Sequence, residues 1–152
     1  REVRVMLDPK CQSDIETTRF ALLVLANLSS RSENHSVLCE RYLDDIIAYS
    51  KCGDLKCRSN AVLALGNFCS TTDHKREGDT GNTSRLATIA STEGIKSLIS
   101  FAFSANELES TSNAQFQAIA GLRGLGTNDA SRKEIVRQGG LEPLILAATA
   151  TA

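Results

Sequence analysis

One short pattern recurs three times along this chain of 152 residues, each time at the end of a stretch with helical periodicity. The copies read Leu-Ala-Asn-Leu-Ser-Ser, Leu-Gly-Asn-Phe-Cys-Ser and Leu-Arg-Gly-Leu-Gly-Thr, with Asn27, Asn67 and Gly124 at the same place in each. Asn67 follows Asn27 by 40 residues, and Gly124 follows Asn67 by 57. A period near 40 residues is typical of helical repeat proteins, whose units stack and bury each other's apolar faces.

Two further sets of apolar residues recur with the same order. Triplets spaced i, i+3, i+4 predict one face of a short helix, and each triplet is preceded by an apolar pair that predicts another. A unit therefore contains three helices, and no segment has the alternation of a β-strand. The triplets are Leu43-Ile46-Ile47, Ile95-Leu98-Ile99 and Leu141-Leu144-Ile145, the pairs are Val37-Leu38, Ile89-Ala90 and Ile135-Val136, and counting back from Asn27 finds a further triplet, Val3-Met6-Leu7.

These anchors divide the chain into a partial repeat at 1–30, a repeat at 31–70, a repeat with insertions at 71–127 and a partial repeat at 128–152. Both ends of the sequence fall inside a unit, so we expect a segment of a longer array. Glycine permits the sharp turn between two short helices, which places corners at Gly94 and at the pair Gly139-Gly140. Arg41-Tyr42 occupies the corresponding corner of the second unit and predicts a distorted turn.

The extra length of the third unit falls in two polar stretches, residues 71–84 and 104–112. We expect the first to be a mobile surface loop, or else a partner-binding or phosphorylatable element. Asp54, Ser112 and Asp129 stand near expected helix starts, where they are suited to cap the helices.

The segments Arg132–Ile145 and Ala61–Phe68, taken with this order of helices, resemble the armadillo repeat. The related HEAT repeat is the alternative, although its units pair two helices and lack the glycine corner. The armadillo resemblance implies an all-α, right-handed solenoid of three-helix repeats. It also implies that the long third helices line a concave groove that binds an extended peptide or a partner protein.

In such a groove, the resemblance implies that the asparagine of each long helix hydrogen-bonds the main chain of the bound peptide. That position is held here by Asn27, Asn67 and Gly124, and capping of the last helical turn is the alternative role for the two amides. The nuclear-import armadillo proteins carry a tryptophan four residues earlier, where this chain has Leu23, Leu63 and Ala120.

The catenin-like branch instead lines its groove with basic residues, for which Arg19, Arg58 and Arg123 are the candidates in this chain. Across the long helices, the predicted partner-binding residues are Asn27, Leu63, Asn67, Arg123, Arg19 and Leu23.

Catalytic and metal chemistry have little basis in the sequence. The two histidines, His35 and His74, have no nucleophile tied to them by sequence, and we expect both to be solvated. Cys52 and Cys57 resemble half of a zinc site, but no second pair of ligands follows at a suitable spacing. We therefore expect a protein that is not an enzyme and that has no catalytic residues, metal or cofactor.

Charge and hydropathy narrow the classes of partner. The 17 Lys and Arg residues against 18 Asp and Glu residues give a net charge of −1, too little positive charge for a nucleic-acid binder. The longest apolar run, Phe20–Leu25, is far shorter than a membrane-spanning helix. The five cysteines are an odd number that suits reduced thiols, so we expect a cytoplasmic protein, or a nuclear or cytoskeleton-associated one.

The function expected from these observations is that of a protein-interaction scaffold. The alternative is a structural building block of a large assembly, such as a cytoskeletal or ciliary complex.

Overall fold

The computed structural model describes residues 14–69, 80–91, 93–103 and 109–149. Within these ranges the chain is all-helical and contains no β-strand, which confirms the all-α prediction. The predicted helix at Val3-Met6-Leu7 lies outside them. The elements are α2 (Ile15–Leu28), a 3-10 turn η2 (Ser32–Asn34), α3 (His35–Tyr49), α4 (Leu55–Cys69), α5 (Thr80–Ser91), α6 (Glu93–Phe103), α7 (Glu109–Leu125), α8 (Asp129–Arg137) and α9 (Leu141–Thr149).

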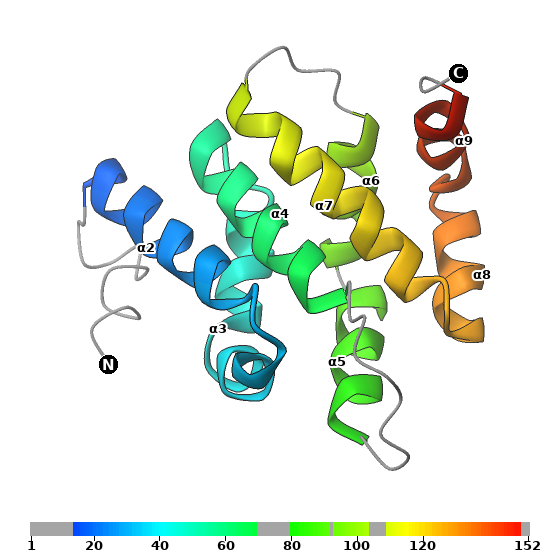
Figure 1. Cartoon of the computed structure of the whole chain (residues 1–152), viewed down its shortest axis with the longest axis horizontal. Coiled ribbons are helices and arrows are strands. Elements are labelled where there is room, and N and C mark those ends of the chain that lie inside the picture. Colours follow the sequence, from blue (N-terminus) through cyan, green and yellow to red (C-terminus); the bar gives the residue numbers. More distant parts are fainter. Residues whose placement is uncertain (1–13, 70–79, 92, 104–108, 150–152) are drawn as a thin grey trace.

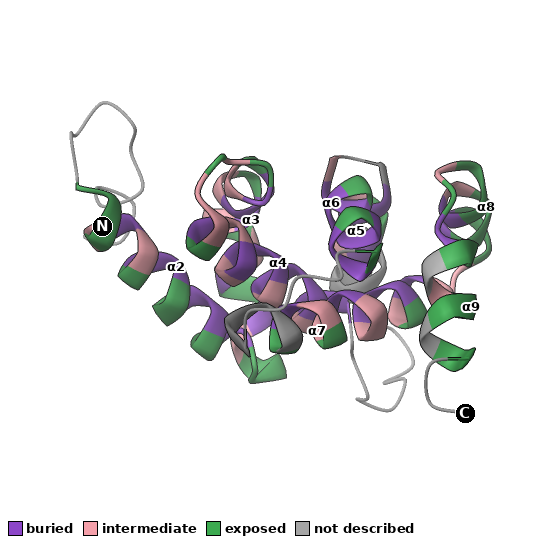
Figure 2. Ribbon diagram, turned by 90° about the horizontal axis from the view of Figure 1, so that it is seen from above, coloured by how far each residue is buried: buried purple, intermediate pink, exposed green. Residues whose placement is uncertain are grey.

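The three helices that end in the recurring pattern form a row. They are α2, α4 and α7, and they run side by side in the same direction with α4 in the middle (Figure 1). Helices α3, α5, α6 and α8 lie on one side of this row, and the opposite side of α2 and α7 is exposed (Figure 2). The row therefore has a face that packs on other helices and a face that no other described helix covers.

The core lies between the row and the helices behind it. Helix α4 contributes a face on which Ala61, Leu65 and Phe68 recur at i, i+4 and i+7, as expected for an amphipathic helix. The three equivalent leucines, Leu25, Leu65 and Leu122, are all buried. The largest fully buried side chains are Phe68, Leu22, Leu25, Ile46, Leu65, Ile89, Ile95, Leu98, Leu122, Leu125 and Val62.

Helices α4 and α7 approach each other closely at two glycines. A Cβ atom on Gly66 would overlap the carbonyl oxygen of Gln117, and one on Gly121 would lie 3.0 Å from the Cα of Gly66. Side chains larger than hydrogen are therefore excluded from this crossing, because the obstacle on the facing helix is backbone that cannot rotate away.

The predicted corners are correct at one position and wrong at two. Gly139 has a φ of +77°, and the N–H groups of Gly139 and Gly140 bond to the carbonyls of Val136 and Ile135, which closes α8 with a Schellman motif. Gly94 instead lies inside α6, and α3 continues through Arg41-Tyr42 without a turn. The second unit thus has one helix where two were predicted, because no glycine interrupts residues that all tolerate helical backbone.

The predicted polar stretches and caps agree with the structure only in part. Helix α5 begins at Thr80 and α7 at Glu109, so residues 80–84 and 109–112 are helical rather than loop, while 71–79 and 104–108 lie outside the described residues. Asp54 caps α4 as predicted, since its Oδ1 accepts from the N–H of Cys57 at 2.9 Å. Ser112 lies inside α7, and α8 is capped by Asn128 rather than by Asp129.

Replacing Gly66 with alanine should destabilise the protein by about 1–3 kcal/mol, because the new methyl group meets the backbone of α7. This loss should exceed the gain of about 1 kcal/mol that alanine brings to a helix interior. Urea unfolding measures the change. Gly53→Ala is the matched control, because no atom lies within 4 Å of the place that its methyl group would take. Equal stability of the two variants would contradict the close approach.

Candidate partner-binding groove

An open groove of about 460 Å³ lies between α2 and α4, and exposed residues of both helices line it. Its wall on α2 has two charged side chains followed by two apolar ones, and its wall on α4 is mostly polar with one leucine. The lining residues are Glu16, Arg19, Phe20 and Leu23 from α2, Lys56, Ser59, Asn60 and Leu63 from α4, and Asn113 from α7.

These lining residues occupy equivalent positions in the sequence. Each residue on α4 follows its counterpart on α2 by 40 positions, and Asn113 follows Lys56 by 57. The same two intervals separate Asn27, Asn67 and Gly124. Within each wall the spacing is i, i+3, i+4 and i+7, which is one face of a helix over two turns. One stripe, repeated on successive long helices, therefore builds the groove.

Three of the six predicted partner-binding residues meet in this groove. Arg19 and Leu23 line it from α2, and Leu63 lines it from α4. Asn27 and Arg123 are exposed but are not among its lining residues, and Asn67 is half-buried in the contact with α2. Their part in binding remains a prediction.

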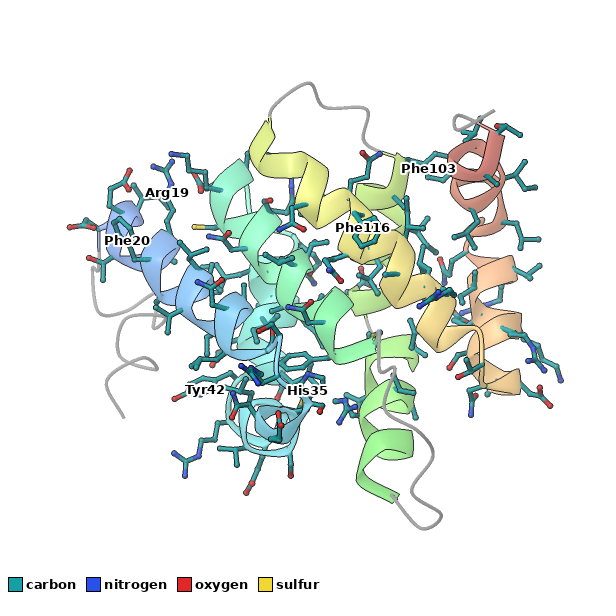
Figure 3. The ribbon with its side chains drawn as sticks, viewed as in Figure 1. Arg19, Phe20, His35, Tyr42, Phe103 and Phe116 are labelled. Carbon is teal, nitrogen blue, oxygen red and sulfur yellow. The ribbon has the colours of Figure 1, made fainter. Side chains whose placement is uncertain are left out.

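Phe20, which is 64% exposed, is the most exposed apolar residue of the groove and was not among the predicted residues. Figure 3 shows Arg19 and Phe20 projecting from α2 and Phe116 from α7. Phe116, 66% exposed, occupies the α7 position equivalent to Ser59 and Arg19. The interval of 40 residues leads from Arg19 to Ser59 and from Leu23 to Leu63, and the interval of 57 leads from Ser59 to Phe116. The repeat could therefore have identified these equivalent positions on α4 and α7.

Arg19 is held in place by two carboxylates. Its Nε and Nη2 donate to Oδ1 and Oδ2 of Asp54 at 3.1 and 2.5 Å, a two-point contact that fixes the plane of the guanidinium group. Its Nη1 also donates to Glu16. The Arg19 guanidinium, and then the N–H of Cys57, hold the pKa of Asp54 well below its ordinary value. One carboxylate thus caps α4 and ties α4 to α2.

Two asparagines on α4 add a second connection to α2. Asn60 Nδ2 donates to the carbonyl of Arg19 at 3.1 Å, and Asn67 Nδ2 donates to the carbonyl of Ala26 at 3.1 Å and to Ser29 Oγ at 3.0 Å. The two asparagines and the two carbonyls are each seven residues apart, or about two helical turns. The pair therefore sets the register of α4 against α2.

His35 is buried, so the expectation that it would be solvated is wrong, and His74 lies outside the described residues. The Nε2 of His35 donates to the carbonyl of Ser29 at 2.7 Å, and its ring meets Phe68 edge-on with centroids 5.2 Å apart. His35 thus lies where α2, α3 and α4 meet (Figure 3). The prediction overlooked that the last carbonyls of α2 have no partner within the helix, so that a nearby histidine can donate to them.

The cysteines of the described residues are free thiols. Burial raises the pKa of Cys39 and of Cys57 to about 12 and raises that of Cys69 as well. These three groups stay protonated at neutral pH, and a protonated thiol is a poor nucleophile and metal ligand. Within the ranges that the structure describes, no group of three or more His, Cys, Asp or Glu side chains is arranged to hold a metal ion.

None of the helices in the described residues is both long and apolar enough to cross a membrane.

No protein-family model matches the chain, and no curated protein matches it. One solved structure, an engineered protein from the Northeast Structural Genomics Consortium, is similar to 95% of this chain at 18% identity, with a TM-score of 0.67. This chain spans 55% of that protein's length. The likeness shows that the helical fold has a counterpart among solved structures.

A second engineered protein from the same consortium is 17% identical over 100% of this chain and 91% of its own, with a TM-score of 0.36.

Replacing Asp54 with asparagine should make stability less dependent on pH. The pKa of Asp54 is lowered from its ordinary 3.8, so its carboxylate stabilises the fold above about pH 4 and loses that effect as the pH falls through the lower folded value. Asparagine caps helices about as well as aspartate, so this substitution removes the charge and keeps the cap. We therefore expect the free energy of unfolding to fall by about 1 kcal/mol at pH 7. Urea unfolding from pH 2 to 7 measures this. Parallel pH profiles for the variant and the wild type would contradict the pairing.

Replacing Asn67 with alanine should lower the free energy of unfolding by roughly 1–2 kcal/mol, because it removes the donor to Ala26 and Ser29. The equivalent change at the exposed Asn27 should cost less than about 0.5 kcal/mol. Chemical denaturation of the two single variants compares them. If Asn27→Ala cost as much as Asn67→Ala, the link between α4 and α2 would be wrong.

Proposed function

We propose that this chain is an armadillo-type repeat segment, part of a right-handed solenoid, that acts as a non-enzymatic protein-interaction scaffold. A partner protein binds along the uncovered face of α2, α4 and α7, with the groove between α2 and α4 as its central contact. The observation that carries the proposal is that the groove is lined by equivalent positions of successive long helices. Repeat proteins use such repeated surfaces for binding.

The chemistry of the groove supports a protein partner. Exposed apolar side chains at Phe20 and Leu23 lie beside the ordered ion pair of Arg19 and Asp54. An aromatic anchor flanked by fixed polar groups is typical of protein interfaces. The reducing interior of a cell suits the free thiols, and the proposal places the protein in the cytoplasm or the nucleus.

The proposal is tested with a photo-crosslinking amino acid placed at Leu23 in the groove and, separately, at Val37. Val37 is 53% exposed on α3, a helix behind the row, and serves as the matched control. We expect a protein to be crosslinked from Leu23 and not from Val37. Phe20→Asp should abolish that product without changing the circular dichroism spectrum, because Phe20 is largely exposed.

A specific observation favours a second function, that of a structural block in a larger assembly. Exposed apolar side chains gather on α8 and α9 at the other end of the row, at Val136, Leu141, Ile145 and Leu146. Crosslinks formed from Ile145 but not from Leu23 would support this function and would contradict the groove proposal.

A further inference from the structure

The recurring asparagine position offers few groups that could hold the main chain of a bound segment. An extended peptide gains much of its affinity from main-chain hydrogen bonds, which here would come from the equivalent positions Asn27, Asn67 and Gly124. Asn67 already donates to Ala26 and Ser29 of the chain itself, and Gly124 has no side chain. Only Asn27 of the three remains, so a ladder of amides along the row cannot form. Contacts with the side chains of the bound segment must therefore supply most of the recognition.

The shape of the groove suits a helix. Its walls are two helices that run in the same direction, and packed helices lie about 8–10 Å apart (Figure 1). Each wall presents one stripe at i, i+3, i+4 and i+7, about 10 Å long. A third helix laid over two such helices presents its own stripe at the same spacing, so its side chains reach both walls.

The two ends of the groove differ in polarity. Leu23 and Leu63 face each other at one end, and Phe20 stands one turn away. At the other end lie Glu16 and Lys56. Glu16 pairs with Arg19, whereas within the described residues Lys56 has no acidic side chain within ion-pair distance. The charge that complements this end is therefore negative, about two helical turns from the leucines.

We propose that the groove between α2 and α4 binds an amphipathic α-helix of a partner protein. This helix inserts apolar side chains between Phe20, Leu23 and Leu63, and it carries an acidic residue two turns away that pairs with Lys56. The inference rests on the proposed function and narrows it from any bound segment to a helix with this pattern.

The test is a selection on the full 152-residue chain from two displayed peptide libraries of equal size. In one library, lactam bridges fix a helix and the i, i+3, i+4 and i+7 positions are randomised. In the other, regularly spaced prolines prevent helix formation. Enriched peptides are synthesised, and fluorescence anisotropy measures their affinity for the wild type and for three variants, Phe20→Asp, Lys56→Glu and Val37→Asp.

We expect binders from the helical library that contain an acidic residue two turns from an apolar one. Phe20→Asp and Lys56→Glu should each weaken them roughly tenfold or more, and Val37→Asp should not. Changing the acidic residue of the peptide to lysine should restore binding to the Lys56→Glu variant. Lys56 is exposed, so this charge swap works without disturbing the fold.

Three results would contradict the inference in whole or in part, and they are distinguishable. Groove-dependent binders that come only from the proline library would contradict the helix and leave the scaffold function standing. A lack of groove-dependent binders in both libraries would contradict the helix and the proposed function together. Helical binders that ignore the charge at Lys56 would overturn the pairing assigned to this end of the groove.

Discussion

The structure depends on how α4 is held between its two neighbours. On one side, Asn60 and Asn67 donate to carbonyls of α2, and Asp54 joins the start of α4 to Arg19. On the other side, the glycine crossing lets α7 approach to backbone contact. The contacts with α2 fix the position of α4 along the axis of α2. The glycine crossing sets the distance between α4 and α7. Together they leave equivalent side chains of α2 and α4 directly across from each other.

The groove follows from this register. If α4 slid by one turn along α2, Leu23 would no longer face Leu63, and the groove would lose its apolar end. Arg19 and Asn60 both build the register and line the groove, whereas Phe20, Leu23 and Lys56 line it, are exposed and take no part in the contacts that build the register. These three exposed positions can therefore change in sequence without loss of the fold. Asn67 occupies the position that the armadillo resemblance assigns to peptide binding, and in this structure its side chain connects α4 to α2.

Much of the fold could be predicted because it has local causes. Apolar spacing placed the ends of α2, α4 and α7, and the glycine pair at 139–140 marked the turn after α8. The continuous α3 could not be read reliably, because Arg41-Tyr42 permits both a helix and a turn, and packing decides between them. His35 was misjudged because its partner, the carbonyl of Ser29, is a backbone atom that no sequence pattern marks. Half of the predicted partner-binding residues line the groove because the repeat interval identifies helix faces. The role of Asn67 could not be foreseen, since it depends on the distance between two helices.

Helices α2, α4 and α7 form an open row, and equivalent positions of α2 and α4 lie at the same level. Spin labels introduced through unnatural amino acids at Glu16, Lys56 and Asn113, taken in pairs, test this arrangement by electron paramagnetic resonance. The row predicts that the two neighbouring pairs are separated by one helix spacing, about 10 Å between helix axes, and the outer pair by about twice that. Three equal separations would mean a closed bundle and would contradict the account.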